Sequence, residues 1–195
     1  MGKTSERTTK LLRTTGNALI GLSVVGVLLT FYPIAREELA YKTRAFSEKP
    51  ISQDFNVMVK SIKVNAPVTK NVNPWNQSQY LPALHNGIAH AKGSSLPDEE
   101  GSVYLFAHSS DAPWRMTRYN TAFFRLGRVS EGDEIIVTYE GKDYRYRVSG
   151  KSVVWPNEVE YLTSQEKDQL ILQTCTPIGT ALKRLLVFAD PIDNY

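Results

Sequence analysis

Short runs of apolar residues, several of them alternating with polar ones, recur through the last two thirds of this chain. Residues 56–64 partly alternate, which is typical of a half-buried strand. Residues 103–107, 170–174 and 185–189 are nearly all apolar and too short for a buried helix to be preferred. Such runs predict strands that are covered on both faces.

A hairpin is predicted further along the same region. Residues 134–139 form one strand, the Gly141-Lys142 pair turns the chain, and residues 143–148 alternate between apolar and charged side chains. Short helices are predicted over residues 121–126 and from Thr163, where Thr163 and Glu166 have the spacing of a capping box. Because the chain shows no βαβ alternation and no repeat, we predict an all-β fold: a closed or nearly closed β-barrel with short peripheral helices.

The first segment has a different pattern. No charged residue occurs between Arg13 and Arg36, a window about as long as a membrane-spanning helix requires. A cleaved signal peptide is the alternative, but its apolar core is usually shorter and the residues after this one offer poor small-x-small sites. The predicted organisation is therefore a cytoplasmic N-terminus (1–15), a transmembrane anchor (16–34), a stalk (35–54) and a β-rich domain (55–195).

Charge and composition indicate how the chain is oriented in a membrane and which kinds of partner it does not bind. Four basic residues precede the apolar segment and three follow it closely, a modest bias that favours a cytoplasmic N-terminus and an extracytoplasmic domain. The balance of 23 Lys and Arg against 20 Asp and Glu argues against nucleic acid. A single cysteine excludes an internal disulfide, and no spacing of cysteine and histidine suggests a structural zinc. We therefore expect no cofactor.

The only cysteine, Cys175, stands where one apolar run ends. Pro177 and Gly179 form a turn after it, and Arg184 opens the next run. If the two strands pair as antiparallel neighbours, a guanidinium lies near the thiol, where it can favour the thiolate and stabilise an oxyanion. The proton-transfer partner should be a histidine, and of the three present only His108 directly follows an apolar strand.

Each of these residues also has a structural interpretation. A lone cysteine is often a buried, inert thiol, an arginine after a loop is usually solvated, and a histidine at a strand end is commonly a satisfied polar residue. The joint arrangement of all three favours chemistry. His90 either lines a substrate groove or holds a loop, while His85 lies in a region rich in Pro and Asn that predicts a surface position.

The motifs around these residues resemble those of the sortases, the membrane-anchored cysteine transpeptidases of bacterial surfaces. The family pattern T-L-x-T-C appears as I-L-Q-T-C at 171–175, and T-P-I-G then leads to K-R-L-L-V at 183–187. The segments G-I-A-H at 87–90 and G-S-S-L-P at 93–97 match the pilin-type and related housekeeping branches. Ala107 stands where the family has glycine before its histidine, which leaves the branch open.

The resemblance implies a mechanism and a set of site residues. Cys175 would attack a surface protein at an LPxTG-like sorting signal, His108 would act as acid and base, and Arg184 would bind the signal and the oxyanion. Thr174, His90 and Ala107 are weaker candidates for substrate binding. The acceptor would be an amine of a cell-wall peptide or a pilin lysine. Residues 42–54 are a candidate cover for the groove.

Three alternatives differ in class. A peptidoglycan L,D-transpeptidase would have a histidine and a glycine directly before its cysteine, where this chain has Gln173 and Thr174. A membrane-anchored β-barrel could act as a binding or assembly module without catalysis. A sortase-like enzyme could act mainly as a hydrolase.

Overall fold

The structure is a computed structural model that describes residues 2–43, 45–109, 121–158, 160–163 and 167–192. The chain divides into two compact units, Met1–Arg44 and Ala45–Tyr195.

The first unit is the helix α1 (Gly2–Thr43). Its stretch Thr9–Tyr32, with a mean hydropathy of 1.6, is long and apolar enough to cross a membrane, by length and composition only. Hydroxyl groups inside this stretch bond to the carbonyl oxygen four residues earlier; Ser23 Oγ, for example, donates to that of Leu19 and Thr30 Oγ1 to that of Gly26. The helix also includes residues 35–43, the beginning of the region predicted as a stalk.

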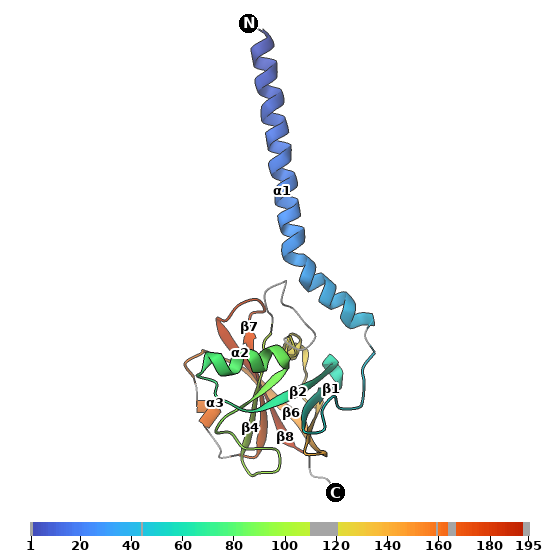
Figure 1. Ribbon diagram of the computed structural model, residues 1–195, viewed down its shortest axis with the longest axis vertical. Helices are drawn as coiled ribbons and strands as arrows, with labels where there is room; N and C mark the ends of the chain where they lie inside the picture. Colours follow the sequence, from blue (N-terminus) through green and yellow to red (C-terminus); the bar gives the residue numbers. More distant parts are fainter. Residues whose placement is uncertain (1, 44, 110–120, 159, 164–166, 193–195) are drawn as a thin grey trace. The chain divides into compact units, whose positions relative to one another are not determined.

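The second unit is a closed barrel whose strand order is β1-β2-β3-β4-β7-β8-β6-β5 (Figure 1). The prediction of an all-β barrel with short peripheral helices is confirmed. The strands are β1 (Phe55–Val59), β2 (Val64–Val72), β3 (Ile88–Ala91), β4 (Ser102–Phe106), β5 (Glu134–Tyr139), β6 (Lys142–Val154), β7 (Gln169–Thr176) and β8 (Lys183–Pro191). The short helices are η1 (Lys60–Ile62), α2 (Gln77–Asn86), η2 (Leu126–Arg128) and α3 (Glu160–Thr163).

Most pairs in the barrel are antiparallel, and two are parallel. The hairpin β5–β6 turns at Glu140 and Gly141, both with positive φ, which is the backbone that a two-residue hairpin loop requires. β2 pairs with β3, and β4 with β7, in parallel. The parallel pairing of β4 and β7 brings the ends of these strands to the same rim of the barrel.

Three predicted elements differ from the structure. The predicted strand 56–64 is broken by η1, after which Lys63 takes a left-handed backbone and lets β2 fold back on β1. The predicted helix at 121–126 is a series of turns that leads into η2. The helix predicted to begin at Thr163 instead ends there, and residues 164–166 of its capping box lie outside the described residues.

The helix α2 has no counterpart among the predicted elements. Asn76 caps its first turn by accepting a hydrogen bond from the backbone N–H of Ser78 at 3.1 Å. Its Pro82 and its scattered apolar positions hide the helical period. Ala83 and Leu84 are buried against the outside of the barrel, and Figure 1 shows the helix lying across that face.

The barrel wall separates two hydrophobic clusters, because successive side chains of a strand point to opposite faces. The inner cluster fills the barrel and includes Leu105 of β4, Leu172 of β7 and Val187 of β8. The outer cluster includes Tyr104, Ile171 and Leu186 of the same three strands, together with α2. These strands are therefore covered on both faces, as their apolar runs predict.

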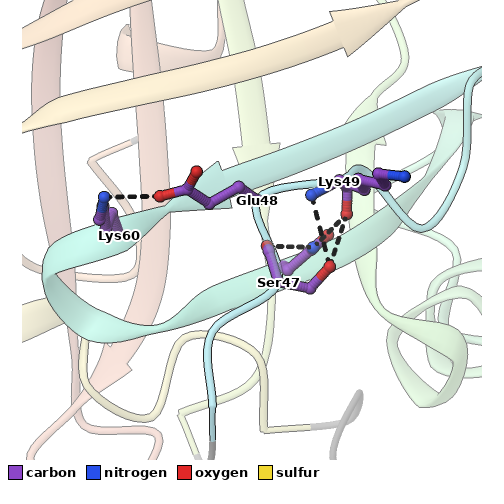
Figure 2. A network of polar contacts seen from close by, with 5 residues as sticks. Ser47, Glu48, Lys49 and Lys60 are labelled. Carbon is purple, nitrogen blue, oxygen red and sulfur yellow. Dashed lines mark hydrogen bonds and ion pairs between the residues drawn. The ribbon is translucent and has the colours of Figure 1, made fainter.

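A short segment ahead of β1, residues 47–54, runs along the outside of the barrel; we call it the strap. Asn65 Nδ2 donates to the carbonyl oxygens of Ser47 at 3.1 Å and Lys49 at 2.8 Å. Glu48 forms an ion pair with Lys60 at 2.7 Å (Figure 2). At the other end of the strap, the carbonyl oxygens of Gln53 and Asp54 accept from the β5–β6 turn.

The strap covers a part of the barrel that would otherwise face solvent. Asn56, Met58 and Asn65 alternate with inward-facing residues, so they point outward, yet they are only 0%, 4% and 4% exposed. Among the described residues, hydrogen bonds join the strap to β2, to Lys60 of η1 and to the β5–β6 turn. The expectation that residues 42–54 cover the groove beside Cys175 stays a prediction.

Candidate active site

The strands β7 and β8 place Cys175 opposite Arg184 in the antiparallel register. Residues paired in this way project from the same face of a sheet. Cys175 has the same parity as Ile171, and Arg184 the same as Leu186, so both side chains project from the outer face. Cys175 is a free, half-buried cysteine.

His108 follows β4, the strand that pairs with β7 on its other side. Two hydrogen bonds continue the contact of these strands past the end of β4: Ala107 N–H donates to the carbonyl oxygen of Gln173 at 3.1 Å, and Thr174 Oγ1 donates to that of Ala107 at 3.0 Å. His108 has the same parity as Phe106 of the outer cluster and is half-buried. The two pairings thus bring His108, Cys175 and Arg184 to one rim of the barrel.

The guanidinium of Arg184 is oriented by the loop that precedes it. Its Nη1 donates to the carbonyl oxygens of Ala181 at 3.0 Å and Lys183 at 3.2 Å. The loop begins with a cis bond between Thr176 and Pro177. Because a guanidinium carries five N–H donors, these two bonds leave others for an anionic oxygen near Cys175.

The three weaker candidates lie on the opposite face of the wall. Thr174, Ala107 and His90 have the parity of inner residues, and their exposures are 3%, 5% and 0%. The expectation that they bind substrate stays a prediction. In the structure Thr174 and Ala107 join β4 to β7, and His90 is bonded to the backbone of Asn71 and Ser95.

His90 is held as a neutral ring with one defined tautomer. Its Nδ1 accepts from the backbone N–H of Asn71 at 3.2 Å, so the ring proton belongs on Nε2, which lies 3.0 Å from the carbonyl oxygen of Ser95. Burial is the main cause that lowers the pKa of His90, and the nearby charge of Lys70 acts in the same direction. A Phe55 ring packs against the imidazole at 5.8 Å.

Sequence reasoning missed a polar pair beside the cysteine. Tyr104 Oη donates to Gln173 Oε1 at 2.6 Å, on the outer face just below Cys175. Burial raises the pKa of Tyr104, while the charge of Arg184 opposes this rise. Gln173 lies two residues before Cys175 on one predicted strand, so the sequence alone could have indicated that both side chains project from the same face.

No metal position emerges from the part of the chain that the structure describes. Within those residues, no three side chains among His, Cys, Asp and Glu gather as metal ligands do.

Comparison with known proteins identifies the family of the barrel unit. Residues 57–192 match the family model of the sortase domain. The chain belongs to the sortase family. Its members are cysteine transpeptidases. Sortase D of Bacillus subtilis is 30% identical over 113 residues, which cover 56% of this chain and 52% of that protein. The chain thus spans about half of the length of this curated relative.

Solved sortase structures share the fold. A lid mutant of sortase A from Corynebacterium diphtheriae is 28% identical, with a TM-score of 0.60 over 76% of this chain and 74% of its own. A sortase C from Clostridium perfringens, solved with the C-terminal cell wall sorting motif, is 24% identical with a TM-score of 0.58, over 71% of this chain and 70% of its own. The sortase match begins at residue 57, so the strap lies ahead of the region that defines the family.

Proposed function

We propose that this chain is a membrane-anchored cysteine transpeptidase that cleaves an LPxTG-like sorting signal and transfers the protein to an amine. The observation that carries the proposal is the register of β7 and β8, which pairs Cys175 with Arg184 next to β4, the strand that His108 follows. A nucleophile, an acid-base group and an oxyanion-binding cation on one rim are the groups that acyl transfer requires.

The first half of the reaction forms a thioester. The Cys175 thiolate attacks the carbonyl carbon of the signal's threonine, and the oxyanion that develops is bound by the Arg184 guanidinium. The bond from carbon to nitrogen then breaks, and His108 in its charged form gives its proton to the leaving amine. The products are a thioacyl-enzyme and a free amine.

The second half releases the acyl group to an acceptor. A primary amine of a cell-wall peptide or a pilin lysine attacks the thioester, His108 takes its proton, and Cys175 leaves as the thiolate. The new bond is an amide, and His108 returns to its charged form. Water in place of the amine gives hydrolysis.

The apolar stretch Thr9–Tyr32 of α1 would hold the enzyme in the bacterial cell membrane, with the N-terminus in the cytoplasm and the barrel outside. The solved sortase C that contains a sorting motif supports a signal peptide as the substrate class. The partners are then surface proteins with C-terminal signals, and the enzyme works where those proteins emerge from the membrane.

Mass spectrometry of the full chain in detergent micelles tests the proposal. We expect a library of LPxTG-like peptides to leave an acyl adduct on Cys175, and a matched Cys175→Ala chain to show none. His108→Ala and Arg184→Ala should each reduce the rate of adduct formation by at least about a hundredfold. Adding an amine should convert the adduct into a transpeptidation product. Absence of any adduct, together with a thiol that reacts slowly with alkylating reagents, would favour the non-catalytic binding module instead.

A further inference from the structure

The outer face of the barrel next to Cys175 is an apolar floor with one polar side chain in it. Gln173 pairs with Phe106 of β4 on one side and with Leu186 of β8 on the other, and both neighbours are buried. Ile171, two residues earlier on the same face, is 1% exposed. Gln173 itself is half-buried and lies between Cys175 and these apolar residues.

The amide of Gln173 is held in one orientation. The Tyr104 hydroxyl is 2.6 Å from Oε1, and since burial raises the pKa of Tyr104, this hydroxyl keeps its proton and acts as the donor. The amide oxygen is therefore turned toward Tyr104, which leaves the two N–H groups of Nε2 on the other side. Among the described residues, Nε2 donates no hydrogen bond to any partner.

A donor at this position matches the repeat of an extended peptide. Residues two apart on a strand are separated by about 7 Å, and alternate carbonyl groups of an extended peptide have the same spacing. If a peptide lies along β7 with its reacting carbonyl at Cys175, the carbonyl two residues earlier lies beside Gln173. In an LPxT-type signal this is the carbonyl of the proline.

We propose that Gln173 is a substrate-binding residue whose Nε2 donates a hydrogen bond to the peptide carbonyl two residues before the scissile bond, with Tyr104 as its positioning residue. The inference rests on the proposed function for the identity of the peptide. It adds a recognition contact upstream of the reacting groups, made by a side chain that sequence reasoning had not assigned.

Nuclear magnetic resonance of the Cys175→Ala chain, in detergent micelles and labelled with ¹⁵N, tests binding without chemistry. Titration with an LPxTG peptide should move the side-chain amide signal of Gln173, which is identified by its loss in Gln173→Met. Gln173→Met should weaken peptide binding about three- to tenfold, as expected for one hydrogen bond. Tyr104→Phe should weaken it less, because the donor remains but is no longer oriented.

A modified peptide separates this contact from general packing. In it, a trans-alkene replaces the amide that carries the proline carbonyl, so the proposed acceptor is removed. The unmodified chain should bind it three- to tenfold more weakly, whereas Gln173→Met should bind both peptides equally. The matched control is Gln169→Met. Gln169 lies on the same strand, and its amide donates to Ser102 Oγ at 3.1 Å. The Gln169→Met chain should bind both peptides as the parent chain does.

The outcomes distinguish this inference from the proposed function. An unmoved Gln173 signal while signals near Cys175 shift, an equal loss with both peptides in Gln173→Met, or no peptide binding at all would overturn the role of Gln173. Peptide binding with the expected Gln173 effects, but no acyl adduct in the chain that keeps Cys175, would overturn the transpeptidase instead.

Discussion

Gly87 ends α2 at a place where the backbone of β2 passes very close. Its φ is +153°, and a Cβ added there would stand 2.4 Å from the carbonyl oxygen of Pro67, a contact that requires the backbone to move. Gly87→Ala should therefore destabilise the barrel by about 2–4 kcal/mol. The matched control is Gly127→Ala, where the new Cβ would meet Leu185 at an ordinary 3.7 Å and should change stability little. Urea unfolding followed by tryptophan fluorescence measures both, and equal midpoints for the two variants would contradict the argument.

The buried imidazole of His90 links stability to pH. Because its pKa is lower in the folded state than the unfolded value of about 6.5, the unfolded chain binds the proton more readily. The neutral imidazole therefore contributes fully to the stability of the fold above the unfolded pKa. This contribution is lost as the pH falls from there through the folded pKa of His90. Protonation would also place a second N–H against the backbone N–H of Asn71.

Urea midpoints between pH 7.5 and pH 5 test this linkage. The unmodified chain should lose stability over this interval, and His90→Gln should lose less, since it removes the titrating ring. His85→Gln, at an exposed residue of α2, should keep the dependence of the unmodified chain. Identical slopes in all three chains would exclude His90 as the source.

At the scale of elements, the end of β4 depends on one hydroxyl of β7. Thr174 is 3% exposed and donates to the carbonyl oxygen of Ala107, the residue before His108. Thr174→Val keeps the shape but leaves that buried carbonyl without this donor, so we expect a loss of about 1–3 kcal/mol. Thr174→Ser keeps the hydroxyl and should recover most of the hydrogen-bond part of that loss. Guanidinium unfolding would detect the difference, and a Ser variant no better than Val would argue against the hydrogen bond.

The strap offers a second test at this scale. Asn65→Asp removes both N–H donors that hold the carbonyl groups of Ser47 and Lys49, and we expect a loss of about 2–3 kcal/mol. Lys60→Ala removes an ion pair whose side chains are 77% and 73% exposed to solvent, so it should change stability little. Chemical unfolding at low and high salt measures the stability of both variants. A larger loss of stability in Lys60→Ala than in Asn65→Asp would mean that the ion pair, not the hydrogen bonds of Asn65, holds the strap.

The elements differ in how well the sequence predicted them, for physical reasons. The strands of Cys175 and Arg184 were predicted because their apolar runs are covered on both faces, and the resemblance of their motifs supplied the candidate residues. The helix α2 was missed because Pro82 interrupts its pattern, and the turns at 121–125 were mistaken for a helix because their apolar residues fill the barrel. Alternation along β7 already places Thr174 on the face opposite to Cys175, but the pairing of β4 with β7, which brings His108 to the same rim, cannot be read from either strand alone.

At the scale of the whole molecule, the barrel is closed by the pairing of β1 with β5, and its compact unit begins at Ala45 rather than at β1. A polypeptide of residues 45–195 should therefore melt at the same temperature as the full chain in detergent. A polypeptide of residues 55–195 lacks the strap and should melt about 5–10 °C lower, because Asn56, Met58 and Asn65 become exposed. Differential scanning calorimetry compares the three, and equal melting temperatures would mean that the strap adds nothing to the barrel.

The two-faced wall of β4, β7 and β8 has a consequence for how such an enzyme can diversify. The inward side chains and the buried outward ones, such as Ile171 and Leu186, both stabilise the barrel, whereas Gln173 is a half-buried outward position beside Cys175. Under the role proposed for Gln173, substitutions there alter recognition at a small cost in stability. A laboratory library restricted to Gln173 should therefore yield a high fraction of soluble, folded variants, from which a new signal preference can be selected by binding.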